Sequence, residues 1–242
     1  MLTTRKQLWI AAASSLAVVA PLSVYLFHKA NHIDRPLRIG YQNSPPYHFP
    51  DVHGNPTGPA VDIIRAAAAR QGIELKWVFS PQGPEKALDS GAVDLWPILG
   101  ELPERRRLAY VSPPWTEMSF MIVAPESRSI RSLEDMAGKT LAASVNISLE
   151  GRIAREYLGH AVIVPSAGTT DVLDKVCSGA AAAGLISVNR LSGLRIGSCA
   201  AGALHIVPIR GATFWFGVGA NRRSPVAISA ANLLRDEIGQ MA

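Results

Sequence analysis

The sequence predicts an α/β protein with mainly parallel sheets, and three observations support this fold class. Extended apolar runs alternate with helical patterns from Pro36 to the end of the chain, which is the order expected of strand–helix–strand units. Of the 242 residues, 48% are hydrophobic and 18% are charged, which suits one domain or two small lobes. Glycine and proline mark frequent turns but form no low-complexity tract.

The first half of this alternation contains four expected strands and three expected helices. The strands are residues 36–41, 74–80, 93–99 and 119–124, and the helices are 57–73, 84–91 and 132–138. In the first helix Val61, Ile64 and Ala68 share one face, and Gly72 stands just past its end, where a left-handed cap favours glycine. Ser132 is the expected N-cap of a helix of one or two turns.

The second half continues in the same way. The expected strands are 140–144, 161–165, 184–188, 204–209 and 213–220, and the expected helices are 148–159, 169–179 and 224–242. The last helix opens with Ser224 as its cap and Pro225 at its first position. Parallel strands place ligands at their carboxyl ends. The loops of interest therefore follow Tyr41, Ser80, Leu99, Ser144 and Val188.

The N-terminal residues predict one transmembrane helix. Residues 8–27 carry no charge, and about 20 apolar residues are enough to cross a bilayer as a helix. Arg5 and Lys6 precede the run, which favours a cytoplasmic N-terminus and an exported body. The alternative is a signal peptide that is cleaved after export. We place the anchor and linker at residues 1–35 and the body at 36–242.

Cysteine content and charge bear on the compartment and the partners. Cys177 and Cys199 both lie in the exported part, where an oxidising environment permits a disulfide; two buried thiols are the alternative. The net charge is +5, but the basic residues are scattered and aromatic residues make up only 7%. With no recognisable nucleic-acid-binding motif, we expect no nucleic-acid partner.

Motifs of the common catalytic and metal sites are missing from the sequence. It has no G-x-S-x-G or HExxH, and Cys177 has no evident partner for nucleophilic catalysis. His48 and His53 lie in a loop rich in glycine and proline, and we interpret them as surface residues. We therefore expect a binding protein rather than an enzyme, with no cofactor and no metal.

Five segments, in order and with matching spacing, resemble a known family. They are RIGYQNSPPYHF, DVHGNPTGPAVDII, LDSGAVDLWPILGELPERRRLAYVSPPW, SIRSLEDMAGKTLAAS and DVLDKVCSGAAAAGLISV. The family is the bacterial extracellular solute-binding proteins of family 3, periplasmic receptors for polar amino acids and related solutes. The resemblance runs from about Leu37 to the end of the chain. It implies a type II-like periplasmic binding protein fold, in which two α/β lobes are joined by two crossing strands.

The resemblance also implies an organisation and a function. Lobe 1 would contain about residues 36–118 and 214–242, and lobe 2 about 121–213, with crossings near 119–120 and 212–214. The protein would capture a small polar, carboxylate-bearing solute for an ABC permease or a signalling partner, in the periplasm and tethered to the inner membrane. An enzyme of the dehydratase type on the same fold, or a ligand-free sensor or interaction domain, are the alternatives. The chain ends soon after its last helix, which favours a tethered receptor or a sensor module.

The same resemblance assigns the ligand's carboxylate to Arg105. Residues 103–105 match the family spacing from turn to arginine, and Ser112 and Pro114 match the Ser-x-Pro that follows. A guanidinium suits this role because its fork of donors grips a carboxylate and keeps its charge when desolvated.

The neighbouring charges allow another interpretation of Arg105. It would then lie at the surface and pair with Glu101 or Glu104. Arg106 and Arg107 fall on other faces of the turn, and we expect both in solvent.

Eight further contacts follow from the register of the family. They are Tyr41, Gln42 and Ser44 after the first strand, Trp96 and Gly100 before Arg105, and Asn146, Ser148 and Ser187 in the second lobe. Each has a simpler interpretation: an ordinary turn, a core tryptophan, or a plain N-cap at Ser148.

Three departures from the family bear on the ligand. Leu102 replaces a threonine that donates to the carboxylate, and the stacking aromatic residue is missing, with Phe79 as its substitute. Ser187 stands where the family has an acid that pairs with the ligand's α-ammonium group. A lost charge-assisted partner of roughly 1.5–3 kcal/mol argues against an ordinary α-amino acid. A carboxylate without the amine, another small anion or a neutral polar solute is favoured instead.

Overall fold

The computed structural model describes residues 33, 35–103, 105–144, 148–188, 198–199 and 202–241. The chain divides into two units, Met1–Pro36 and Leu37–Ala242, and the second holds every helix and strand of the described part. None of these helices combines the length and the apolar run that crossing a bilayer requires. The predicted transmembrane helix at residues 8–27 lies outside the described residues.

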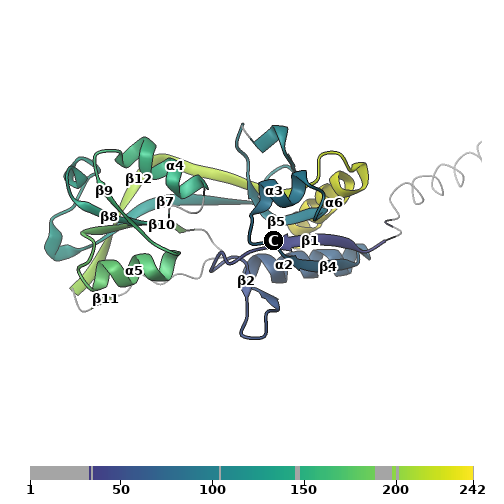
Figure 1. Cartoon of the computed structure of the whole chain (residues 1–242), viewed down its shortest axis with the longest axis horizontal. Coiled ribbons are helices and arrows are strands. Elements are labelled where there is room, and N and C mark those ends of the chain that lie inside the picture. The colour runs from purple at the N-terminus through teal and green to yellow at the C-terminus, as the bar shows by residue number, and fades with distance from the viewer. Residues whose placement is uncertain are drawn as a thin grey trace, which may run out of the picture. The chain divides into compact units, whose positions relative to one another are not determined.

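The second unit is built of two α/β lobes (Figure 1). The first lobe contains β1 (Leu37–Tyr41), β2 (Phe49–Pro50), β3 (Pro56–Thr57), α2 (Pro59–Gln71), β4 (Leu75–Phe79), α3 (Pro84–Asp89), β5 (Leu95–Gly100), the 3-10 turn η1 (Arg105–Arg107), β6 (Tyr110–Val111) and α6 (Pro225–Met241). The second contains the 3-10 turns η2 (Glu126–Arg128) and η3 (Glu134–Met136), then β8 (Thr140–Ala143), α4 (Ser148–Leu158), β9 (Val162–Pro165), α5 (Thr169–Cys177), β10 (Ala183–Val188) and β11 (Ser198–Cys199).

Two long strands, β7 (Thr116–Pro125) and β12 (Gly202–Ala220), run through both lobes (Figure 1). The main sheet has the order β4-β1-β5-β12-β7-β10-β8-β9, and β6 and β11 also pair with β12. The predicted crossing residues face each other in this ladder. Ser119 pairs with Thr213, and their hydroxyls lie 3.0 Å apart. The register shifts between Pro208 and Thr213, so β12 is irregular where it passes between the lobes.

Parallel pairing is limited to the two ends of the sheet. β4, β1 and β5 are parallel to one another, as are β10, β8 and β9, whereas β7 and β12 pair antiparallel with each other and with their neighbours. The prediction of mainly parallel sheets therefore holds within each lobe and fails at the crossing. Neighbouring strands joined by a helix within one lobe run parallel. β7 and β12 instead pass from one lobe into the other, in opposite directions, and therefore pair antiparallel.

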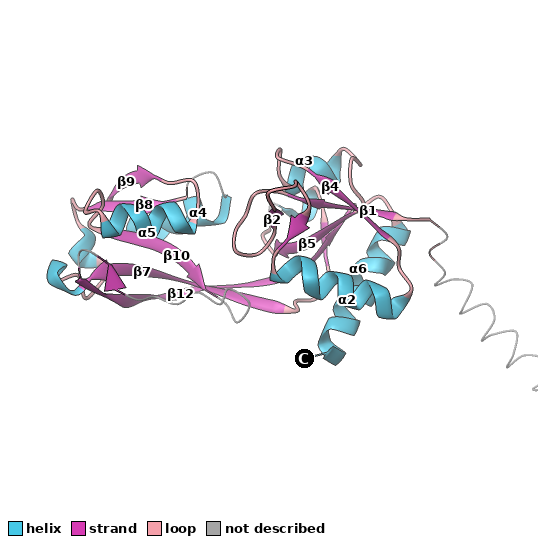
Figure 2. Ribbon diagram, turned by 90° about the horizontal axis from the view of Figure 1, so that it is seen from below, coloured by secondary structure: helices cyan, strands magenta, loops and turns pink. Residues whose placement is uncertain are grey.

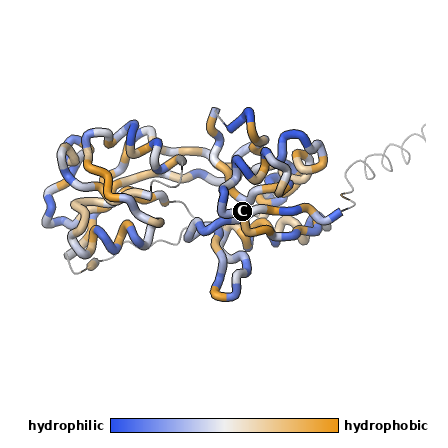
Figure 3. Tube along the Cα trace, viewed as in Figure 1, coloured by the Kyte–Doolittle hydropathy of each residue, from blue (hydrophilic) through white to orange (hydrophobic). Residues whose placement is uncertain are grey.

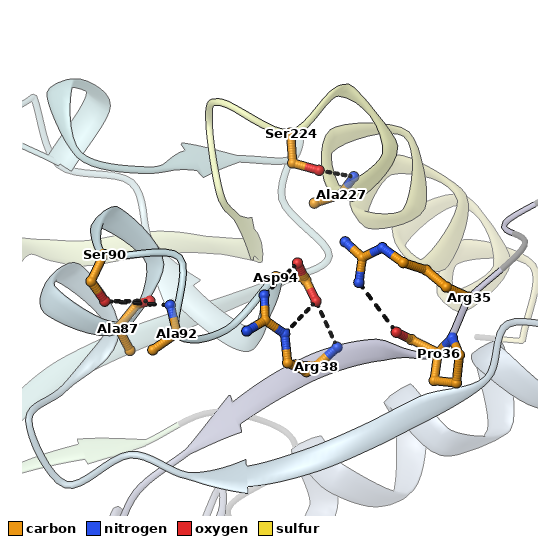
Figure 4. Close-up of polar contacts among 9 residues, drawn as sticks. All are labelled: Arg35, Pro36, Arg38, Ala87, Ser90, Ala92, Asp94, Ser224 and Ala227. Atoms are coloured by element: carbon orange, nitrogen blue, oxygen red, sulfur yellow. Dashed lines mark hydrogen bonds and ion pairs between the residues drawn. The ribbon is translucent and has the colours of Figure 1, made fainter.

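Local sequence signals account for several element ends. Gly72 has φ 64° after α2, and Ile73 N–H donates to Ala68 O at 2.9 Å, as a left-handed cap requires. Ser224 Oγ accepts from Ala227 N–H at 3.2 Å at the start of α6 (Figure 4).

The helix of one or two turns predicted at 132–138 is shorter than expected and is a 3-10 helix. The structure has only the short turn η3 there, and the Asp135 carboxylate accepts from the Arg131 and Ser132 N–H groups at its start. Residues 204–209 and 213–220, predicted as two strands, belong to the single strand β12.

Packing and partly buried ion pairs stabilise the first lobe. β5 is buried along its whole length, as expected for a strand covered on both faces. Figure 3 shows hydrophobic and hydrophilic stretches interspersed along the chain. α2 and α6 lie side by side on the sheet (Figure 2), where Arg70 and Gln71 both bind Glu237. At the start of β5, buried Asp94 accepts from the Arg38 backbone N–H and from its guanidinium, at 2.9–3.1 Å (Figure 4).

A disulfide joins the end of α5 to the short strand β11. Cys177 and Cys199 are bonded, with their Cα atoms 5.4 Å apart and 22 residues apart in sequence. β11 pairs with β12, so the bond ties this hairpin to α5.

We expect the double variant C177S/C199S to lose roughly 3 kcal/mol of unfolding free energy, because the bond closes a loop of about this length in the unfolded chain. Urea unfolding under oxidising conditions measures the loss. Reductant should bring the wild type to the level of the variant and leave the variant unchanged. Equal midpoints for the two oxidised proteins would contradict the prediction.

Candidate functional site

A cavity of about 80 Å³ is lined by residues of both lobes and of the crossing strands. Its polar side chains come from the turn after β1, from η1 and its neighbours, and from the second lobe. They are Gln42, Ser44, Tyr47, His48, Trp96, Arg105, Glu150 and Ser187. Met118, Phe120 and Phe216 of β7 and β12 add apolar walls. The cavity lies beyond the carboxyl ends of β1, β5 and β10, where parallel strands place ligands.

Arg105 is buried beside this cavity, with 6% of its surface exposed. Its Nε donates to Glu85 Oε1 at 2.6 Å, and its Nη1 donates to the Gly100 carbonyl at 2.9 Å. A Cβ on Gly100 would lie 3.2 Å from Nη1 and 3.0 Å from Phe216, so glycine here lets the guanidinium approach the end of β5. The first turn of α3 supplies Glu85, which neutralises much of the buried charge.

Of the two acids offered as surface partners of Arg105, Glu101 pairs with the neighbouring Arg106. Arg106 forms an ion pair with Glu101, and both side chains are exposed. Arg107 is exposed as well, while Glu104 lies outside the described residues. The turn η1 therefore points one guanidinium inward and two outward.

The interpretation of His48 as a surface residue is wrong, because only 3% of its surface is exposed. Its Nδ1 accepts from Gln42 N–H at 3.2 Å, and its ring meets Trp96 edge-on with centroids 5.7 Å apart. Burial lowers the pKa of His48 to about 4, so the ring is neutral at pH 7 and adds no positive charge to the cavity.

Three buried polar atoms next to the cavity have no hydrogen-bond partner in the described part of the chain. They are Tyr47 OH, Ser144 Oγ and Glu150 Oε2. All three residues line a smaller cavity of about 20 Å³, which shares Ser44, Tyr47, Glu150 and Ser187 with the larger one. Buried polar groups normally find partners, so this cluster calls for an explanation.

Burial also shifts the acidity of two of these groups. It raises the pKa of the Glu150 carboxyl from 4.5 to about 7. It raises the pKa of the Tyr47 hydroxyl to about 12; the Ser187 hydroxyl works against this shift, and the Glu150 carboxylate adds to it. Tyr47, Glu150 and Ser187 are thus close enough to influence one another.

Six of the nine residues predicted as ligand contacts line the larger cavity: Gln42, Ser44, Trp96, Gly100, Arg105 and Ser187. Tyr41 does not, because its hydroxyl donates to Gly54 O at 2.6 Å and its ring packs against Trp77 and Phe79. Phe79, the expected substitute for the stacking aromatic, is half-exposed and away from the cavity lining. Asn146 lies outside the described residues, as does the side chain of Ser148.

Sequence reasoning missed Tyr47, His48 and Glu150. Tyr47 and His48 follow two prolines in a turn whose Ser44 and His48 pair as an isolated bridge, and this fold-back is not evident from composition. Glu150 is the third residue of α4. Its place in the first turn, after β8, was the one signal that it lies near a strand's carboxyl end.

Comparison with known proteins decides the family. A sequence profile of the bacterial extracellular solute-binding proteins, family 3, matches residues 37–233. The chain belongs to this family. A search of curated protein sequences finds no significant match.

Several solved structures have the same fold as this solute-binding protein. An amino acid ABC transporter substrate-binding protein from Streptococcus pneumoniae, bound to L-arginine, has a TM-score of 0.69 and 17% identity over 88% of this chain and 92% of that one. An ancestral arginine-binding protein bound to arginine has 0.66 and 22% over 86% and 94%. An ancestral amino acid-binding protein, a precursor of cyclohexadienyl dehydratase, has 0.66 and 20% over 90% and 93%.

The described acids near Arg105 in the sequence do not line the cavity of this family 3 protein. Glu101 and Glu117 are both exposed, and neither lines the larger cavity. No group of three or more histidine, cysteine, aspartate or glutamate side chains in the described ranges is arranged to hold a metal ion. Glu150 is therefore the described acid to test first.

We expect E150Q to stabilise the ligand-free protein increasingly as pH rises. The raised pKa means that the folded state keeps a proton that the unfolded state has lost, so the wild type loses stability between about pH 4.5 and 7. The gap between variant and wild type should grow by roughly 3 kcal/mol across that window and then level off.

Urea unfolding at several pH values measures the gap. His48 acts in the opposite direction, because its lowered pKa costs stability as pH falls below 6.5, but it is present in both proteins and cancels in the difference. A difference that stays constant from pH 4.5 to 8 would contradict the prediction.

Proposed function

We propose that this family 3 protein captures a small polar solute, bearing a carboxylate, in the cavity between its two lobes. The observation that carries the proposal is buried Arg105, held by Glu85 and Gly100 O at the cavity wall. A cation fixed in this way costs no reorganisation when it meets a carboxylate. The likeness to structures solved with arginine bound supports amino acids as the first solutes to test.

Contacts from both lobes would couple binding to closure. Gln42 and Ser44 belong to the first lobe and Ser187 to the second, and all three line the same cavity. A solute that touches both sets stabilises the arrangement in which they are close. The crossing strands β7 and β12 would carry the motion. The closed state would then be read by an ABC permease or a signalling partner.

Arg105→Ala is expected to weaken binding of such a solute by roughly 10- to 100-fold, the value of a hydrogen bond to a charged group. Small molecules that co-purify with residues 36–242 identify the solute by mass spectrometry, and calorimetry then gives the dissociation constants. Arg106→Ala is the matched control, because Arg106 is the next residue, is exposed, and pairs with exposed Glu101.

A second variant separates binding from folding. Arg105→Lys keeps the charge but cannot keep both the Nε contact to Glu85 and the Nη1 contact to Gly100, so its affinity should lie between wild type and Arg105→Ala. If Arg105→Ala folds and binds like Arg106→Ala, the carboxylate is not recognised by Arg105 and the proposal fails.

We also propose that residues 8–27 tether the protein to the inner membrane, with residues 36–242 in the periplasm. The uncharged run behind Arg5 and Lys6 supports this orientation. The full chain should sediment with membranes after a high-salt or alkaline wash, and its intact mass should include residue 8. A soluble protein that begins beyond residue 27 would instead show cleavage of a signal peptide.

An enzyme on the same fold is a second candidate, favoured by one observation. A carboxyl whose pKa lies near neutrality, that of Glu150, lines the cavity, and such groups act as general acids or bases. One similar structure is described as a precursor of a dehydratase. Incubation with cyclic carboxylic acids, followed by mass spectrometry, decides between them: we expect no turnover, and a product that depends on Glu150 would favour the enzyme.

A further inference from the structure

A second cavity, of about 580 Å³, lies on the other face of the crossing strands. Neighbouring side chains along a strand point to opposite faces. In β7, Met118 and Phe120 line the cavity between the lobes. Glu117, Ser119 and Met121 alternate with them and line the second cavity, which we call the rear cavity. The crossing strands therefore separate two cavities, and the volume of the rear one falls in the range of small-molecule sites, roughly 300–1,000 Å³.

Two tryptophan side chains give the rear cavity aromatic surface. Trp115 immediately precedes β7 and is partly buried. Trp215 of β12 stands opposite Glu117 in the antiparallel ladder, and 55% of its surface is exposed. Side chains that are directly opposed on one face of a sheet have Cβ atoms about 5 Å apart. One wall of the cavity thus sets an indole beside a carboxylate and leaves about half of the Trp215 surface for a ligand to cover.

The charge of the rear cavity comes from a single residue among those described. Glu117 is exposed and has no ion-pair partner within the described ranges. The other lining residues are neutral: two tryptophans, a methionine, a valine, a proline, a serine and a threonine. An anion would be repelled by the carboxylate. A cation would be attracted both by the carboxylate and by the negative faces of the indole rings.

The lining also distinguishes between classes of cation. Calcium and magnesium ions need about six or more oxygen ligands, and the described lining offers side-chain oxygens from Glu117, Thr116 and Ser119 alone. The Ser119 hydroxyl already lies 3.0 Å from that of Thr213. A primary ammonium is strongly hydrated, and the cavity has few acceptors to replace its water. An alkylated ammonium presents methyl groups, which need no hydrogen bonds and pack against indole faces.

We propose that the rear cavity binds a small organic cation of the alkylated-ammonium class, with Glu117 as its counter-charge and Trp115 and Trp215 as its aromatic walls. The site differs from the cavity of Arg105 in its residues, in its charge and in its face of the crossing, so it does not rest on the proposed function. A cation bound there would also contact Val188, at the end of β10, and would thus touch the second lobe as well as the crossing.

Choline and its neutral carbon isostere, in which carbon replaces the quaternary nitrogen, test the need for charge. Calorimetry is run on the full chain, purified in a non-ionic detergent, at constant ionic strength. We expect choline to bind saturably and roughly tenfold more tightly than the isostere, and sodium chloride to give no saturable heat. Tetramethylammonium chloride is the second probe, because it keeps the charged methyl groups and lacks the hydroxyl.

Variants at exposed positions assign the site without changing the core. Glu117→Gln should weaken choline binding roughly tenfold. Trp215→Leu should weaken it several-fold and Trp215→Phe by less, because phenylalanine keeps an aromatic face. Glu156→Gln is the matched control, since Glu156 is an acid on α4 that pairs with Arg152 and is not among the described residues of the rear cavity; it should bind choline like the wild type. Melting temperatures without ligand check that each variant is folded.

Three results would overturn the site. The first is equal affinity for choline and its isostere, because the rear cavity would then not select a cation. The second is choline binding that Glu150→Gln abolishes and Glu117→Gln does not, because the cation would then lie between the lobes. The third is the absence of saturable binding by both choline and tetramethylammonium. All three leave carboxylate recognition by Arg105 standing, so the two proposals fail separately.

Discussion

The pairing of β7 with β12 is the constraint on which both lobes depend. Each of these strands is shared, and β5 pairs with β12 on one flank while β10 pairs with β7 on the other. The parallel strands of the two lobes therefore end toward a common space, with Gly100 on one side and Ser187 on the other. Side chains of the crossing itself, Met118, Phe120 and Phe216, line that space. A ligand there touches the elements that would move and the strands on which they would move.

Charge is distributed unevenly across this cavity. On the first lobe, Arg105 is neutralised by Glu85 before any ligand arrives. On the second, Glu150 is left with an unpartnered oxygen and a carboxyl that burial makes hard to ionise. The strain of an unpaired buried acid is relieved either by a proton or by a cation.

The predictions made from the sequence agree with the structure where interactions between near neighbours in the chain decide the outcome. The caps at Gly72 and Ser224 depend on neighbours within a few residues, and the structure has both. The turn η3 keeps the expected start, where Asp135 accepts from the Arg131 and Ser132 N–H groups, but it is shorter than the predicted helix. The antiparallel pairing of β7 with β12 was also not predicted, because it depends on the fold of the second lobe, which lies between these two strands in the chain.

The sequence by itself determined the α/β alternation, the family and the position of Arg105 beside a strand's end, since these rest on local periodicity and on motifs read in order. Only the tertiary structure decided which charges meet. Arg105 pairs with Glu85, 20 residues away, and Glu150 lies beside Tyr47, from the other lobe. It also buried His48 and turned Tyr41 away from the cavity. Burial and electrostatic partnering are set by segments distant in the chain, and a pattern of neighbouring residues does not contain them.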